Sequence, residues 1–142
     1  MSEVKVQMEA FFAEYARTND GGDYEREAGY FAPAFVAAGP AGAQVVKRDD
    51  FAAALPKRKQ MFEAWGQKGA TLKNLEVTEL DTRRVLAMTE WRMDFELKDG
   101  RKDALDVKSI FLVEENAGRW EIVLYQACQD IVALVRARGW ME

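Results

Sequence analysis

The chain has 142 residues, 49% of them hydrophobic and 31% charged, which is the composition of one soluble globular domain spanning 1–142. Its formal net charge of −4 offers no basic footprint for a nucleic acid, so we expect no nucleic-acid partner. The sequence has neither an apolar run of about 18 residues nor a secretion signal, which favours a cytoplasmic protein without a membrane partner.

Two scarce residue types limit the chemistry that the chain can perform. Cys128 is the only cysteine, so a single chain can form neither a disulfide nor a thiolate metal site. Histidine is absent, which removes the usual proton shuttle near neutral pH and the commonest metal ligand. We therefore expect no metal and no cofactor, and any acid–base work must fall to carboxylates, Tyr, Lys or Cys.

Helical periodicity opens the chain. An apolar stripe predicts a first helix that ends near the breaker at 19–22, and its members are Val4, Met8, Phe11, Phe12 and Tyr15. A short second helix is expected over 23–30, with Asp23 as its N-cap. Residues 35–38 and 43–48 are typical of two short strands joined by a Gly-Pro-Ala-Gly turn.

A third helical region begins at Asp49 or Asp50. Its apolar side consists of Phe51, Leu55, Phe62 and Trp65. Pro56 disfavours helical geometry at the preceding residue, so we expect a break or a kink there. Glycines at 66 and 69 should end the region. The basic run 57–59 within it is interpreted as a solvated helix face.

The second half of the chain changes to a period of two. Strands are expected over about 72–79, 85–97, 105–113 and 120–128, with turns at 81–83, 98–101 and 116–118. Ile131, Leu134 and Val135 indicate a short closing helix. Helices followed by a long antiparallel meander predict an α+β domain with the helices on one face of a curved sheet.

This order of elements resembles the nuclear transport factor two-like superfamily, and most closely its SnoaL-like branch. The most specific match is the last hairpin, SIFLVEENAGRWEIV, which is similar to the family's apolar strand, polar turn and Gly-Arg-Trp-x-Ile entry. The resemblance implies a cone-shaped antiparallel or mixed sheet, with the N-terminal helices on its concave face and a ligand at its mouth. Relatives include polyketide cyclases, ketosteroid isomerases and limonene-epoxide hydrolases, so the fold does not decide the function.

Pairing across the 98–101 hairpin decides which residues share a face. A two-residue turn at Asp99-Gly100 would set Arg92 opposite Val107 and Glu90 opposite Ser109, on the face that also carries Trp120. We assign that face to the helices and the pocket. The opposite face is assigned to a homodimer interface formed by Trp91, Met93, Ile110, Leu112, Val123 and Tyr125. A bulge or a different turn would exchange the two faces.

The expected pocket combines apolar residues with a few polar groups. The candidate ligand-binding residues are Tyr15, Tyr30, Phe35, Met61, Trp65, Met88, Glu90, Arg92, Ser109, Phe111 and Gln126. Several of them can equally be core residues, because aromatic and Met side chains at regular spacing usually pack the interior. Cys128 lacks a histidine partner and is interpreted as a small buried residue.

Glu90 and Arg92 are the candidate catalytic residues. Their spacing on one strand allows an Arg to keep a carboxylate ionised, although a solvated charge ladder explains the same pattern. The piece TEWRMD also resembles the Arg-x-Asp stretch of limonene-epoxide-hydrolase-like proteins through Arg92 and Asp94. The second Asp of that group is missing, since Gln126 or Ala127 stands where the resemblance requires it.

Three functions remain open at the level of sequence. The first is the binding of a small, largely apolar molecule in the cone. The second is an isomerase, dehydratase, cyclase or epoxide-hydrolase-like enzyme that works through Glu90, Arg92 or a tyrosine. The third is a dimerising association module with a vestigial pocket. An open cavity that contains a carboxyl of raised pKa would favour an enzyme, whereas a filled cone would favour the association module.

Overall fold

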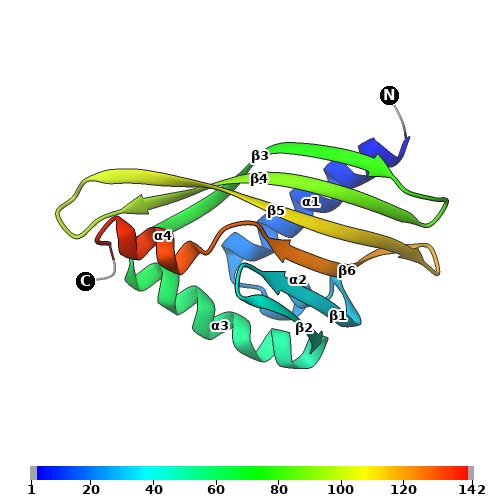
Figure 1. Cartoon of the computed structure of the whole chain (residues 1–142), viewed down its shortest axis with the longest axis horizontal. Helices are drawn as coiled ribbons and strands as arrows, with labels where there is room; N and C mark the ends of the chain where they lie inside the picture. Colours follow the sequence, from blue (N-terminus) through cyan, green and yellow to red (C-terminus); the bar gives the residue numbers. More distant parts are fainter. Residues whose placement is uncertain (1–2, 141–142) are drawn as a thin grey trace.

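A computed structural model describes residues 3–140 and forms a curved six-stranded sheet with helices on its concave side (Figure 1). The helices are α1 (Glu3–Gly21), α2 (Tyr24–Ala28), α3 (Arg48–Ala64) and α4 (Ile131–Ala137). The strands are β1 (Phe31–Gly39), β2 (Gly42–Lys47), β3 (Gln67–Glu79), β4 (Arg84–Glu96), β5 (Lys102–Asn116) and β6 (Arg119–Ala127). None of the described helices is long and apolar enough to cross a membrane.

The sheet runs in the order β2-β1-β6-β5-β4-β3. Strands β3 to β6 form the expected antiparallel meander, and β1 joins its end by pairing with β6 in parallel. The predicted α+β class with a mixed, curved sheet is therefore confirmed.

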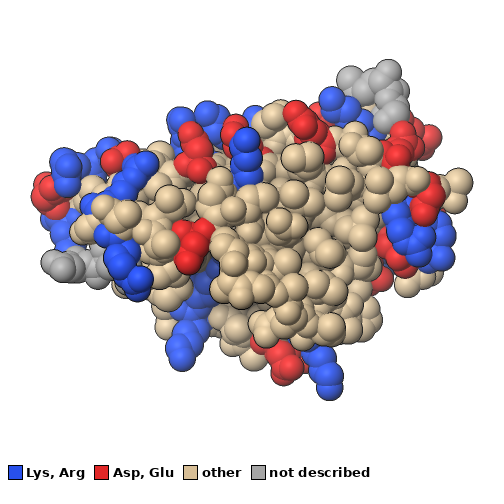
Figure 2. Space-filling view, in the orientation of Figure 1, with Lys and Arg blue, Asp and Glu red and all other residues tan. Residues whose placement is uncertain are grey.

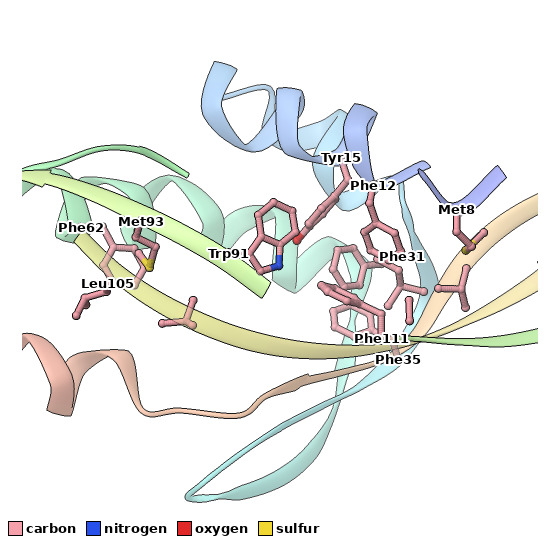
Figure 3. Close-up of a cluster of buried hydrophobic side chains, with 14 of the residues drawn as sticks. Met8, Phe12, Tyr15, Phe31, Phe35, Phe62, Trp91, Met93, Leu105 and Phe111 are labelled. Carbon is pink, nitrogen blue, oxygen red and sulfur yellow. The ribbon is translucent and has the colours of Figure 1, made fainter. Parts of the chain in front are cut away.

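Helix α1 lies across the concave face, and its predicted stripe makes most of the contact. Met8 and Phe12 are fully buried, and Tyr15 is 8% exposed. A hydrogen bond fixes the start of the helix, because the Trp120 indole N–H donates to Gln7 Oε1 at 2.9 Å. Figure 3 shows Phe12 and Tyr15 pointing from α1 toward Trp91 and Phe111 of the sheet.

Individual residues predicted to begin, interrupt or end the helices α2 and α3 can now be compared with the structure. Asp23 caps α2, since its side chain accepts a hydrogen bond from the Arg26 backbone N–H at 3.3 Å. The break expected at Pro56 does not occur. Helix α3 runs without interruption from Arg48 to Ala64. Gly66 ends the helical region with φ +100, and β3 begins directly after it, earlier than predicted.

The hairpin between β4 and β5 corrects the predicted register. The Leu97 N–H donates to the Arg101 carbonyl at 2.8 Å, which closes a loop of residues 98–100 with Gly100 at φ +86. This loop is one residue longer than the predicted two-residue turn, and a Gly in the left-handed region is typical of it. Arg92 therefore faces Asp106, and Glu90 faces Lys108.

A one-residue change in register exchanges the two faces of β4. Trp91 and Met93 point into the cone and are 7% and 6% exposed, whereas Glu90 and Arg92 lie on the outer face. The predicted assignment of the Trp91 side of β4 to a partner subunit is wrong for this reason. Ile110 and Leu112, from the same predicted interface, do lie on the outer face.

A bulge changes the faces of β6 as well. Ile122 pairs with Val113, but Leu124 pairs with Leu112, so Val123 is the extra residue on this strand. Before the bulge, Trp120 and Ile122 face α1, as predicted. After the bulge, Gln126 and Cys128 turn away from the cone. The bulge brings Tyr125 inward, where its ring stacks on Phe111 at a centroid distance of 5.1 Å.

Candidate functional site

A cavity opens between the helices and the concave face of the sheet. Its volume is about 120 Å³. All four helices, the start of β3, and strands β4 to β6 contribute to its wall. Its apolar lining consists of Leu55, Phe62, Ala70, Trp91, Met93, Val107, Phe111 and Ile131.

The short helix α2 places a carboxyl group in this cavity. Glu27 is 4% exposed and lines the cavity next to residues of α3. Burial raises the pKa of the Glu27 carboxyl to about 7, although the positive charges of Arg58 and Lys59 act in the opposite direction. A carboxyl with this pKa can both accept and donate a proton near neutral pH.

Two tyrosines and an arginine surround the same space. Burial, followed by the neighbouring Glu27 and Tyr125, raises the pKa of the Tyr15 phenol, so this group is a neutral hydroxyl at physiological pH. Arg58 lines the same cavity, close enough to Tyr125 for the phenol to act on the pKa of the guanidinium. Loss of water around the guanidinium alone would lower the pKa of Arg58, but Tyr125, Tyr15 and Glu27 outweigh this effect and raise it.

Polar contacts at the rim hold α1, α3 and β3 together. Lys59 Nζ donates to the backbone oxygens of Asn19 and Asp20 at 3.2 and 3.3 Å, near the C-terminal end of α1. The Asp20 carboxylate accepts a hydrogen bond from the Ala70 N–H at 3.2 Å. Lys59 and Asp20 therefore serve mainly to fix the mouth of the cavity.

Two linked hydrogen bonds, both buried, hold Trp91 in the cavity wall. The Trp91 indole N–H donates to Thr89 Oγ1 at 2.8 Å, and the Thr89 hydroxyl donates to the Ser109 carbonyl at 3.0 Å. Both threonine and serine are almost fully buried. These bonds orient the Trp91 ring against Tyr15, at a centroid distance of 6.3 Å.

Of the residues predicted to bind a ligand, Tyr15, Ser109 and Phe111 line the cavity. Phe35 lies in the core instead, at a ring-centroid distance of 4.6 Å from Phe31, and Tyr30 packs against the core. Trp65 packs on Phe62, at 5.4 Å between ring centroids, and does not reach the lining. Met61 is 38% exposed on α3.

The other predicted site residues lie on the outer face of the sheet because of the corrected register. Met88 and Glu90 border a second hollow on that face, which also has a volume of about 120 Å³. Arg92 forms an exposed ion pair with Asp106 at 3.3 Å between Nε and Oδ1. Gln126 is exposed opposite Ile110. In this structure these residues contribute nothing to the cone cavity.

Three residues of the cavity wall were not predicted as site residues from the sequence: Glu27, Arg58 and Tyr125. Nothing distinguishes Glu27 from the neighbouring acids Asp23 and Glu25 except the fold. Arg58 did carry a signal, since it stands three residues after Leu55 and four before Phe62, on the apolar stripe of α3. Because Arg58 stands between two lysines, the whole basic run was interpreted as a solvated helix face.

Metal ligands do not gather anywhere in the described part of the chain. Within residues 3–140, no group of three or more Cys, Asp or Glu side chains could hold a metal ion. Cys128 is exposed rather than buried, in contrast to the prediction.

Comparison with known proteins bears on the fold. No protein-family model matches the sequence, and no curated protein matches it significantly. Solved structures do match: Aln2 from a Streptomyces species has a TM-score of 0.73 at 16% identity, over 97% of this chain and 98% of its own.

Two further structures are similar to the chain. An NTF-2-like protein of unknown function from Shewanella oneidensis has a TM-score of 0.72 at 16% identity, over 88% of this chain and 98% of its own. A ketosteroid isomerase-like protein from Erwinia carotovora atroseptica has a TM-score of 0.66 at 19% identity, over 90% and 97%. The chain therefore has the nuclear transport factor two-like fold that the sequence resemblance implied.

Proposed function

We propose that this protein binds a small, largely apolar molecule in the cone cavity. The observation that carries the proposal is an open cavity with aromatic and aliphatic walls and a few convergent polar groups, which is the usual composition of a small-molecule site. A cavity of about 150 Å³ holds benzene in an engineered protein, so a space of about 120 Å³ fits a group close to one ring in size. An unfilled cone also argues against a vestigial pocket.

Binding can be tested through the tryptophan indole N–H signals in NMR spectra. Of the four tryptophans, Trp91 alone belongs to the cavity lining. Titration with cyclohexanone should shift the Trp91 signal and leave that of Trp140 in place, and a cavity-filling Val107→Phe variant should abolish the shift. Equal shifts of both signals, or none in the native protein, would refute binding in the cone.

A second proposal is that the site catalyses proton transfer on its ligand, and the pKa of Glu27 favours it. The Glu27 carboxylate would remove a proton from the carbon beside a carbonyl group. Tyr15 or Arg58 would hold the resulting enolate oxygen, and Glu27 would return the proton to the same or a conjugated carbon. This sequence balances without a cofactor and describes an isomerase. Glu27 and Arg58 here take the roles that sequence analysis gave to Glu90 and Arg92.

Deuterium exchange separates this enzyme from a binding protein. In D₂O at neutral pH, the native protein should speed deuterium incorporation next to the carbonyl of cyclohexanone about 100-fold over Glu27→Gln. Glu25→Gln, on the exposed side of the same helix, should keep the full rate. Binding of cyclohexanone without any difference between the native and Glu27→Gln proteins would leave a binding function alone.

A homodimer through the outer face of the sheet remains a proposal. Its basis is a group of apolar residues that no described helix covers, which we call the outer apolar patch: Leu86, Met88, Ile110, Leu112 and Leu124. Figure 2 shows a broad uncharged area over these strands, with most charged groups near its edges.

A further inference from the structure

We infer that the ligand of the cone cavity is a ring-bearing carboxylate whose oxygens are held by the Arg58 guanidinium. This inference rests on the proposed binding function and names the chemical class of the ligand. Its structural basis is the position of Arg58, the phase of α3 and the distribution of charge around the cavity.

Helix α3 directs Arg58 into the cavity. Leu55, Arg58 and Phe62 share one stripe of the helix, and all three line the cavity. The guanidinium carbon lies 5.3 Å from the centroid of the Phe62 ring. Stacking on this ring restricts the orientation of the Arg58 side chain, which is exposed to solvent at the mouth of the cavity. The cation is thereby held beside the apolar wall before any ligand arrives.

Arg58 retains hydrogen-bonding capacity for a ligand. A guanidinium has five N–H donors in a planar fork, whereas a phenolic oxygen such as that of Tyr125 can accept only some of them. Within residues 3–140, no carboxylate oxygen comes within 4.0 Å of the Arg58 nitrogens. The planar fork matches a carboxylate, which it can bind through two parallel bonds.

Two other charged side chains of the site already have partners. Lys59 is engaged with the end of α1, and Asp20 is engaged with the backbone of β3. Glu27 is half protonated near neutral pH, so Arg58 is incompletely neutralised there. The apolar wall leaves room for about one ring beside the cation. An aromatic or alicyclic monocarboxylate satisfies both the charge and the apolar volume.

Binding of a carboxylate should then take up a proton at Glu27. A negative charge at Arg58 cancels part of the positive field that lowers the pKa of Glu27, so the protonated form becomes more favourable. Affinity is therefore highest below about pH 7 and falls as Glu27 ionises. The ionisable side chains that face this space are Tyr15, Asp20, Tyr24, Arg58, Lys59, Glu63, Lys68 and Tyr125.

Calorimetric titration with benzoate and with its neutral analogue benzamide tests the inference. At pH 6 the native protein should bind benzoate about 10-fold more tightly than benzamide, which is the usual effect of a hydrogen bond to a charged group. Arg58→Met keeps the apolar stem and should bind the two compounds equally. Lys57→Met, which removes an exposed cation from the adjacent position, should retain the preference.

The pH dependence of the affinity is measured with the same two compounds. From pH 6 to pH 8, benzoate should bind the native protein about fivefold more weakly, as expected for a one-unit pKa change at Glu27, while Glu27→Gln should show no such decline. Equal binding of benzoate and benzamide by the native protein, or an undiminished preference in Arg58→Met, would overturn the carboxylate class and leave the binding function intact. Binding of neither compound would overturn both proposals.

Discussion

At the scale of single residues, Glu27 should govern part of the pH dependence of folding. Its folded pKa of about 7 exceeds the ordinary value of 4.5, so the folded state binds more protons than the unfolded state between these two values. The free energy of unfolding therefore falls as the pH rises from about 4.5 to 7, because ionisation of Glu27 is less favourable in the folded state than in the unfolded state. Glu27→Gln removes the titrating group and should be more stable than the native protein at pH 8, by up to about 3 kcal/mol.

Denaturant unfolding at pH 4.5 and pH 8 measures this difference. The gain in Glu27→Gln should nearly vanish at pH 4.5, where the native carboxyl is largely protonated in the folded state and no longer opposes folding. Glu25→Gln provides the matched control, because Glu25 is exposed on the same helix, and its stability should follow the native curve at both pH values. A gain that is the same at both pH values would contradict a buried carboxyl of raised pKa.

Thr89 is the second residue whose substitution has a clear expected cost. Its hydroxyl accepts from the Trp91 indole and donates to the Ser109 carbonyl, and all three residues are buried. Thr89→Val has nearly the same volume but removes both side-chain bonds and leaves the buried Trp91 indole N–H without its acceptor. The expected loss of unfolding free energy is about 2–3 kcal/mol, measurable by urea denaturation. Thr78→Val, at an exposed position of β3, should change stability little; equal losses would mean that the two linked hydrogen bonds add nothing.

At the scale of elements, periodicity predicted the helices and strands because each buries one face. The register could not be predicted, since it depended on one residue in the 98–100 loop and on the bulge at Val123. Both features exchange the faces of a strand without changing its apolar alternation. Glu90 and Arg92 were therefore misplaced although β4 was correctly found. Arg58 was accessible to sequence reasoning through the phase of α3, while Glu27 required the tertiary fold.

The junction between α3 and β3 depends on Gly66. Its φ is +100, and a Cβ at this position would stand 2.2 Å from the Glu96 backbone oxygen, which cannot move aside easily because the Glu96 N–H bonds to the Gly66 carbonyl at 2.8 Å. Gly66→Ala should therefore cost at least about 2 kcal/mol of unfolding free energy. Thermal unfolding followed by circular dichroism would measure this loss.

Gly21→Ala is the control for that substitution. A Cβ added at Gly21 would meet no atom within 4 Å, and this glycine closes α1 without positive φ. Alanine should be neutral or slightly stabilising there, because it favours the helix. If both substitutions had the same effect, the close approach of β4 to Gly66 would not constrain the junction.

At the scale of the whole molecule, the outer face of the sheet is divided into two halves. The outer apolar patch occupies one half, where Met88 is 43% exposed and pairs across strands with Ile110. Charged residues, including the Arg92–Asp106 ion pair, occupy the other half. A patch of this kind suits a two-fold contact between copies, in which the same surface meets itself and about 800 Å² per subunit is covered in a stable complex.

Sedimentation velocity at micromolar concentration tests this arrangement. The native protein should sediment as a dimer, and Met88→Lys should shift it toward the monomer, because two added charges would meet across the symmetry axis without a partner. Glu96→Lys introduces the same side chain on β4 in the charged half and should leave the dimer intact. The folded state of each variant would be checked by its far-UV spectrum. A native monomer, or a dimer unaffected by Met88→Lys, would show that this face does not hold a second copy of the chain.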